Sequence, residues 1–313
     1  MELSLDAVTK SFGEKRVLEG ISFTASSGAA LGLLGRNGAG KTTTIRIIMG
    51  VFPPDGGQLL IDGRPIQANE ISFGYLPEER GLYPKQKIIE QMIYIGRLRG
   101  LSRQAARKSA EYWLERLDMS AHRNDLLRTL SKGNQQKIQL GVCLIHNPDI
   151  VILDEPFSGL DPVNAQLLKD IVSELAAAGK TVIFSSHQMS YVEEFCDSIA
   201  ILDQGKIALE GNLRAIKRSY DRTKIQVSLE GGQSVQRLEA MRSDGRLSGF
   251  VTEILAAERP AEAEDSAVVH ITTPDDKDRL LREILEAGCS LEAFQVMEPT
   301  LEQIFVEKVG ESK

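Results

Sequence analysis

An apolar segment, Ala29–Leu34, leads directly into a glycine-rich loop, and this junction constrains the fold more than any other part of the chain. The loop, residues 35–42, reads GRNGAGKT and fits the pattern GxxxxGK[ST], and the apolar residues of Thr42–Met49 recur at helical spacing. Glycines let backbone N–H groups close around phosphate oxygens, and the start of a helix adds the positive end of its dipole. A strand, a phosphate-binding loop and a helix in this order indicate an α/β fold.

The loop supplies candidate ligands for a nucleotide and for a metal ion. We expect Lys41 to reach the β- and γ-phosphates and the Thr42 hydroxyl to bind Mg²⁺. The alternative is a glycine-rich turn that happens to carry a lysine, and the strand and helix around the loop argue against it. The other loop residues that we assign to nucleotide binding are Gly35, Asn37, Gly38, Gly40 and Thr43.

A pair of carboxylates, Asp154 and Glu155, follows the apolar segment Ile150–Leu153. Many strands end in an aspartate, so this pair is a weak signal alone and a strong one beside a phosphate-binding loop. We expect Asp154 to hold Mg²⁺ through water and Glu155 to orient or deprotonate the attacking water. Together the two motifs predict a hydrolytic nucleotide site.

The first two thirds of the chain alternate strand and helix. The first ~35 residues show the apolar–polar alternation of strands joined by short turns. Helical spacing predicts helices over residues 87–118 and 135–146. Ile150–Leu153 and Thr181–Ser185 are continuous apolar runs, typical of parallel strands buried on both faces, with a helix predicted over Pro162–Ala178 between them.

A break at residues 217–223 separates these elements from a smaller domain of a different kind. We expect an α/β domain at 1–218 and a small α+β domain at 219–313. Beyond the break the pattern predicts the order βαββαβ, which resembles a ferredoxin-like split βαβ unit, and then a final helix at 299–308. The polar stretch 256–265 is expected to be a loop.

Charge is unevenly distributed along the chain. The net charge is −7; residues 1–219 carry a net charge of +1, and residues 220–313 carry −8. A net acidic chain is a poor candidate for binding nucleic acid through its phosphates. Three cysteines lie far apart and form no CxxC or Cys/His cluster, so the sequence supports neither a disulfide framework nor a zinc site and favours buried thiols. The longest apolar runs also fall well short of the ~18–20 residues that a membrane helix needs.

Four further motifs make the pattern specific. Residues 130–136 read LSKGNQQ, residues 158–161 read SGLD, His187 follows the apolar run Thr181–Ser186, and Phe12 precedes the phosphate-binding loop. Taken together and in this order, the motifs resemble the ATP-binding subunits of ATP-binding cassette (ABC) transporters. The resemblance covers residues 1 to about 218 and implies the P-loop NTPase fold of an ABC ATPase, with an antiparallel β subdomain and a helical subdomain at about 80–146.

The resemblance implies a head-to-tail dimer with two ATP molecules between the chains. Ser131 and Gly133 of one chain would contact the γ-phosphate held by Lys41 of the other. His187 would contact the γ-phosphate and help to position the attacking water, which Glu155 would orient or deprotonate. Lys41, Glu155 and His187 therefore form the implied catalytic set. Phe12 would stack on adenine, and Asp161 belongs to the implied nucleotide site. Without the other motifs, a packed ring on an edge strand would be the preferred interpretation of Phe12.

The sequence departs from the family pattern at three positions. Lys132 replaces a glycine of the family signature, and Asn134 replaces a glutamine. Glu78 stands where the family has a glutamine; its carboxylate can still bind Mg²⁺ but cannot donate a hydrogen bond to water. The alternative for Glu78 is a solvated acid in a loop.

The resemblance extends to a particular group of transporters. Residues 298–305, EPTLEQIF, match the closing helix of accessory domains in exporter ATPases, and residues 75–84, YLPEERGLYP, are similar to the group that includes sodium and antibiotic exporters. The implied function is ATP hydrolysis that drives export through a separate integral membrane permease. The implied location is the cytoplasm, peripherally on the cytoplasmic face of the membrane. The partner ATPase is a second copy or a paired ABC subunit, and no nucleic acid is expected.

Other interpretations remain open at this stage. The basic region 80–137, with a net charge of +8, either faces a membrane partner and anionic lipid or is a solvated helical surface. A nucleotide sensor with little turnover is compatible with Glu78 and with the altered signature. A soluble ABC ATPase acting on DNA or ribosomes is disfavoured, because the chain has one cassette, no long coiled-coil insertion and an acidic C-terminal region.

Overall fold

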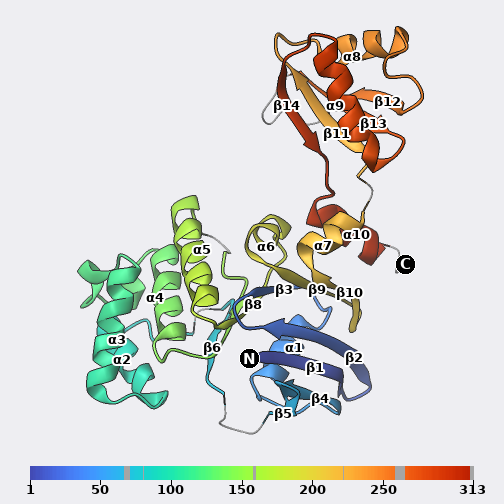
Figure 1. Ribbon diagram of the computed structural model, residues 1–313. Coiled ribbons are helices and arrows are strands. Elements are labelled where there is room, and N and C mark those ends of the chain that lie inside the picture. The colour runs from blue at the N-terminus through green and yellow to red at the C-terminus, as the bar shows by residue number, and fades with distance from the viewer. Residues whose placement is uncertain (67–70, 80, 158–159, 221, 258–264, 311–313) are drawn as a thin grey trace. The chain divides into compact units, whose positions relative to one another are not determined.

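A computed structural model of the protein describes residues 1–66, 71–79, 81–157, 160–220, 222–257 and 265–310 (Figure 1). The chain forms two compact units, one of Met1–Leu213 with Phe305–Lys313 and the other of Arg214–Ile304. The expected domain boundary at residues 218 and 219 stays a prediction. Residues 80, 158 and 159 and most of the loop expected at 256–265 lie outside the described residues.

A six-stranded sheet forms the centre of the first unit. Its strand order is β10-β9-β3-β8-β7-β6, and every neighbouring pair is parallel except β10 with β9. Three of its strands are buried at every residue, as their continuous apolar sequences predict. The strands are β3 (Ala30–Leu34), β6 (Phe73–Leu76), β7 (Ile150–Asp154), β8 (Thr181–Ser185), β9 (Ser198–Asp203) and β10 (Lys206–Asn212).

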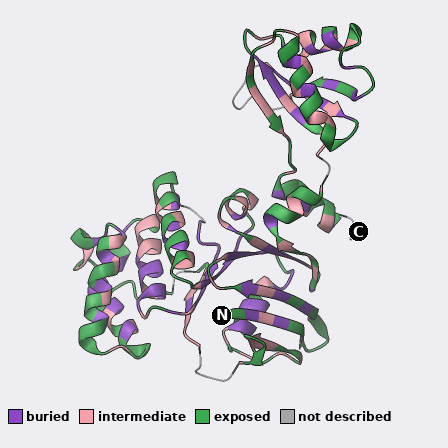
Figure 2. Cartoon of the chain, in the orientation of Figure 1, coloured by how far each residue is buried: buried purple, intermediate pink, exposed green. Residues whose placement is uncertain are grey.

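A second, antiparallel sheet in this unit has the order β2-β1-β4-β5. Its strands are β1 (Glu2–Phe12), β2 (Lys15–Ser26), β4 (Gly56–Ile61) and β5 (Arg64–Pro65). Alternation along β1 and β2 buries Leu3, Leu5 and Phe23 in a core that also contains Ile45 and Ile152. This shared core joins the antiparallel sheet to the central one, and the buried residues of both are visible in Figure 2.

Three helices pack against one another as the predicted helical subdomain: α2 (Ile88–Leu98), α3 (Arg103–Arg116) and α4 (Lys132–Leu144). Helix α4 begins three residues before the predicted start at residue 135, because the Ser131 hydroxyl accepts a hydrogen bond from the Asn134 N–H and caps it. Four further helices precede the strands of the second unit in the chain: α1 (Lys41–Ile48), α5 (Pro162–Ala177), α6 (Met189–Phe195) and α7 (Leu213–Ser219). Two 3₁₀ turns span Ser120–His122 and Leu127–Thr129.

The second unit contains an antiparallel sheet of order β12-β13-β11-β14. Helix α8 (Ser234–Ser243) and helix α9 (Lys277–Glu286) contribute Leu238 and Leu280 to the core of this sheet. The observed chain order β11-α8-β12-β13-α9-β14 is the predicted βαββαβ arrangement. The strands are β11 (Lys224–Leu229), β12 (Val251–Ala256), β13 (Ser266–Ile271) and β14 (Leu291–Val296), with a 3₁₀ turn at Pro274–Asp276. The last helix of the chain, α10 (Leu301–Gly310), begins in this unit, and its residues from Phe305 onward belong to the first unit.

No helix in the described parts of the chain is both long and apolar enough to cross a membrane.

Two of the three cysteine thiols should resist alkylation in the native protein. Burial raises the pKa of Cys143 to about 12 and also raises the pKa of Cys196, whereas Cys289 is partly exposed. At pH 8 a thiol with such a pKa is a thiolate in only about one molecule in ten thousand. A native thiol assay at pH 8 should therefore report one fast-reacting group, and a denatured sample should report three. Fast reaction of two groups, or a fast group that persists in Cys289→Ser, would contradict this assignment.

Candidate active site

A cavity of about 890 Å³ lies beside the phosphate-binding loop and the ends of β7 and β8. In parallel sheets of this kind the carboxyl ends of the strands are where ligands bind. The cavity brings together twelve of the predicted site residues, all of which line it: Phe12, Gly35, Asn37, Gly38, Gly40, Lys41, Thr42, Thr43, Glu78, Asp154, Glu155 and His187.

Two glycines of the loop have physical reasons to lack a side chain. A Cβ on Gly35 would lie 2.4 Å from the backbone oxygen of Leu202 in β9, and φ at Gly35 is 157°. Gly40 has a φ of 116° and precedes α1 without a side-chain cap. The N–H groups of the first helical turn are therefore left for a ligand, which suits an anion at the positive end of the helix dipole.

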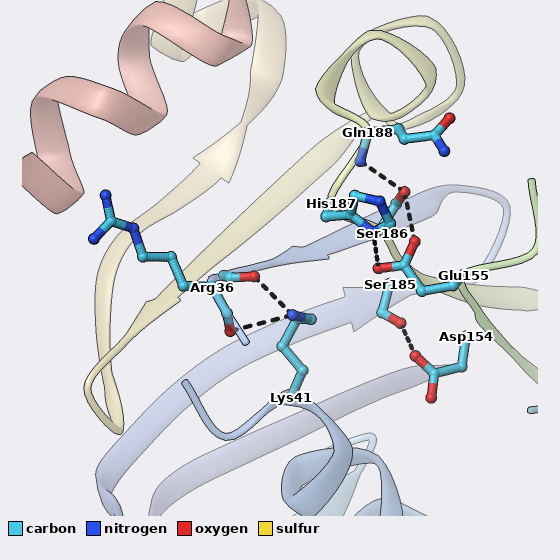
Figure 3. Close-up of polar contacts among 9 residues, drawn as sticks. Arg36, Lys41, Asp154, Glu155, Ser185, Ser186, His187 and Gln188 are labelled. Carbon is cyan, nitrogen blue, oxygen red and sulfur yellow. Dashed lines mark hydrogen bonds and ion pairs between the residues drawn. The ribbon is translucent and has the colours of Figure 1, made fainter. Parts of the chain in front are cut away.

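Lys41 is a half-buried cation that lines this cavity. Its Nζ donates hydrogen bonds to two loop carbonyls, that of Gly35 at 2.7 Å and that of Arg36 at 3.4 Å, and Figure 3 labels Lys41 and Arg36. Burial lowers the pKa of Lys41, and the negative charges of Glu155, Asp154 and Glu78 act in the opposite direction. A lysine ammonium has three donors, so the group can hold both loop carbonyls and still donate one hydrogen bond to a phosphate.

The two carboxylates are held by different donors, as Figure 3 shows. Asp154 accepts hydrogen bonds from the Ser185 hydroxyl at Oδ1 and from the Tyr75 hydroxyl at Oδ2, the latter at 3.3 Å. Burial and the neighbouring Asp154 raise the pKa of Tyr75 to about 12, so its hydroxyl remains a donor.

Glu155 has a different set of partners. The Ser186 hydroxyl donates to Glu155 Oε2 at 3.1 Å, and His187 Nδ1 lies 2.8 Å from Glu155 Oε1. Glu155 also has a φ of 49°, in the left-handed region that costs a non-glycine residue roughly 1 kcal/mol or more. Backbone strain is thus located at the residue predicted to act on water.

Three of these contacts come from residues that sequence reasoning missed: Tyr75, Ser185 and Ser186. The serines do carry a readable signal, because two hydroxyls close the apolar strand Thr181–Ser185 just as two carboxylates close Ile150–Leu153. Tyr75 carries no such signal, since its partner is 79 residues away.

The three predicted metal ligands, Thr42, Asp154 and Glu78, line the cavity and also a neighbouring one of about 860 Å³. A hydroxyl and two carboxylates suit Mg²⁺, which prefers oxygen ligands and usually adds water and phosphate oxygens. Within the described ranges no group of three or more His, Cys, Asp or Glu side chains is arranged to hold a metal ion. The chemistry of the hydroxyl and the two carboxylates fits Mg²⁺.

Ser131, Gly133 and Asp161 do not line this cavity. Ser131 caps α4, and a Cβ on Gly133 would lie 3.4 Å from the Asn164 side chain. Asp161 caps α5 by accepting from the Asn164 N–H at 2.9 Å, and this hydrogen bond is the largest cause that lowers the pKa of Asp161. The implied role of these residues against a nucleotide held by a second chain stays a prediction.

Phe12 lies at the edge of the cavity, where 49% of it is exposed. Its ring packs edge-on against Phe52 with the centroids 5.5 Å apart, and Lys10 Nζ lies 5.8 Å from the Phe12 centroid. The ring is therefore packed on one side and still accessible, which leaves its predicted stacking on adenine possible.

Replacing Gly35 with alanine should damage nucleotide binding. The added Cβ would meet the Leu202 backbone, which cannot move away without shifting β9, so the loop would have to open. We expect ATP affinity to fall about tenfold or more, measured by equilibrium binding. Gly179→Ala is the matched control, because Gly179 has a φ of 76° at the end of α5 with no atom near its Cβ position. An equal loss of affinity in both variants would contradict this role of Gly35.

Two protein-family models match the chain. Residues 18–158 match the family described as ABC transporter, and residues 211–309 match the C-terminal domain described as ATP-binding protein DrrA1-3-like. Among solved structures, the ATP-binding subunit of an ABC transporter superposes with a TM-score of 0.64 at 29% identity, covering 70% of this chain and 93% of the other. These findings confirm the predicted fold class, an ABC-type P-loop NTPase.

Curated relatives match almost end to end. The uncharacterized ABC transporter ATP-binding protein YhaQ of Bacillus subtilis is 40% identical over 98% of both chains. The linearmycin resistance ATP-binding protein LnrL of the same organism is 34% identical over 98% of both. The Nod factor export ATP-binding protein I of Burkholderia lata is 34% identical over 68% of this chain and 71% of its own length. This chain therefore belongs to the ABC transporter family, as an ATP-hydrolysing ATP-binding protein.

Proposed function

We propose that this protein is the ATPase of an exporter, in which ATP closes a dimer of two cassettes and hydrolysis reopens it, driving a substrate through a separate membrane permease. The observation that carries the proposal is the convergence of Lys41, Glu155 and His187 on one cavity. A phosphate-binding cation, a buried acid and an imidazole in one place suit the transfer of a phosphoryl group to water.

Each group has a defined task in this proposal. Lys41 and the loop N–H groups hold the β- and γ-phosphates, and Phe12 stacks on the base. Glu155 accepts a hydrogen bond from the attacking water, while His187 turns to the γ-phosphate. When it is bound with ATP, Mg²⁺ supplies positive charge that offsets the charge on the phosphate oxygens. Thr42, Asp154 and Glu78 would hold it.

The second half of each site comes from another chain in this proposal. The hydroxyl of Ser131, the backbone of Gly133 and the Asp161 segment lie at the starts of α4 and α5, outside the cavity. A helix start suits an anion, so these residues can complete the site around the γ-phosphate of a partner. Because the phosphate then bridges two chains, binding favours the closed dimer and hydrolysis removes the bridge.

Export, rather than import, is supported by the relatives. One matches nearly end to end and is named for resistance to linearmycin, and another is named for Nod factor export. The basic helical region, with a net charge of +8 over residues 80–137, suits a position beside a permease and the anionic cytoplasmic surface of a membrane.

Replacing Glu155 with glutamine should separate ATP binding from hydrolysis. Glutamine keeps the shape but cannot accept a proton, so ATP turnover should fall about a hundredfold or more while ATP affinity changes less than about twofold. Light scattering after size-exclusion chromatography should show a dimer of Glu155→Gln with ATP and a monomer with ADP. Glu111→Gln, which alters an exposed pair on α3, is the matched control. Turnover of Glu155→Gln at the wild-type rate would overturn the assignment.

Transport has a separate readout. Inside-out vesicles that contain the chain with its permease should accumulate substrate only with ATP, and Glu155→Gln should abolish the accumulation. ATP-driven loss of substrate from such vesicles would indicate import and overturn the exporter proposal.

A further inference from the structure

Two adjacent serines at the end of β8 face the two adjacent carboxylates at the end of β7. The strands are parallel and pair Asp154 with Ser185, so the next residues, Glu155 and Ser186, come side by side as well. Ser185 is 0% exposed and Ser186 is 1% exposed, so neither hydroxyl depends on solvent for its orientation. Figure 3 shows each serine directed at one carboxylate.

We propose that these serines are positioning residues with separate tasks, Ser185 orienting Asp154 on the metal side and Ser186 orienting Glu155 on the water side. The proposal rests on the function proposed above, in which Asp154 faces Mg²⁺ and Glu155 faces the attacking water. It adds a reason why each carboxylate keeps its orientation through the catalytic cycle.

The Ser186 hydroxyl has its direction set by the backbone. The Gln188 N–H donates to Ser186 Oγ at 3.0 Å, so that oxygen already serves as an acceptor. A hydroxyl has a single hydrogen, and Ser186 donates it to Glu155 Oε2, with Ser186 Oγ and Glu155 Oε2 3.1 Å apart. The contact is therefore a fixed donor to the carboxylate and not one of several rotamers.

Ser186 is also the partner that stays when His187 moves. The side chain of His187 is 61% exposed, and it holds Glu155 Oε1 at 2.8 Å. An exposed ring that lines the cavity can turn to a γ-phosphate, whereas a buried serine cannot leave its place. When His187 turns, Glu155 keeps one donor at Oε2, and that donor limits the rotation of the carboxylate.

Ser185 acts on a carboxylate with a different environment. Asp154 receives the Ser185 hydroxyl at Oδ1 and the Tyr75 hydroxyl at Oδ2. Both donors are neutral, so they fix the plane of the carboxylate and leave its negative charge for a cation. Loss of Ser185 should therefore weaken metal binding, and loss of Ser186 should slow the step that involves water.

The first experiment compares Ser186→Ala with Ser186→Thr, which retains the hydroxyl. The kcat of Ser186→Ala should fall about tenfold or more, and KM for ATP should stay within about twofold. The variant lacks a hydrogen bond to the buried Glu155 carboxylate, and that bond serves the hydrolytic step rather than ATP binding. Ser186→Thr should recover most of the lost rate. A Ser186→Thr variant that melts like wild type and is as slow as Ser186→Ala would overturn the proposal.

The second experiment measures metal binding without turnover. In Ser185→Ala the Kd for Mn²⁺, followed by electron paramagnetic resonance with a non-hydrolysable ATP analogue, should rise about tenfold, and in Ser186→Ala it should stay within about twofold. Raising Mg²⁺ should restore part of the ATPase rate of Ser185→Ala and none of the rate of Ser186→Ala. Identical metal affinities and Mg²⁺ responses in the two variants would overturn the separation of tasks.

Ser228→Ala is the matched control, because Ser228 is also 1% exposed and hydrogen-bonded, to Ser266 in the second unit. It should keep wild-type kinetics. Failure of the proposed function would appear differently: the wild type itself would lack ATPase activity, or Glu155→Gln would leave that activity unchanged. If Glu155→Gln is inactive and both serine variants match the wild type, only the positioning proposal fails.

Discussion

The alignment of three buried parallel strands is the constraint on which the rest of this structure depends. Strands β3, β7 and β8 are apolar at nearly every position and buried on both faces, so their register is fixed by packing. Their ends then present, in one cavity, the phosphate-binding loop, the pair Asp154 and Glu155, and the segment of Ser185 to His187. A slip of one residue in any strand would remove one of these groups from the cavity.

Within that frame the site places a half-buried cation, Lys41, among three acids. The carboxylates of Asp154, Glu155 and Glu78 attract the Lys41 ammonium, and partial burial strengthens each of these interactions. The acids differ from one another in their donors, since Asp154 is held by neutral hydroxyls and Glu155 by a serine and a histidine. That difference allows two neighbouring carboxylates on one strand to serve different steps.

Much of the fold was predictable because apolar periodicity is a local property. The buried strands Ile150–Asp154 and Thr181–Ser185, and the βαββαβ order of the second unit, follow from such patterns. The start of α4 was predicted three residues late, because the Ser131 side chain caps the helix at its N-terminus and apolar periodicity does not detect a cap. The site contact of Tyr75 was missed for a related reason, since it joins residues on neighbouring strands that are 79 positions apart.

The sequence by itself determined the chemistry of this protein: a loop that can surround phosphate, an acid pair after a buried strand, and the order of motifs that identifies an ABC ATPase. These are properties of residue type and spacing, which survive without coordinates. Only the tertiary structure decided how the groups are held, because the donors to Asp154 and Glu155 come from other strands. The tertiary structure also kept Ser131, Gly133 and Asp161 out of the cavity, since they begin helices that lie elsewhere in the unit.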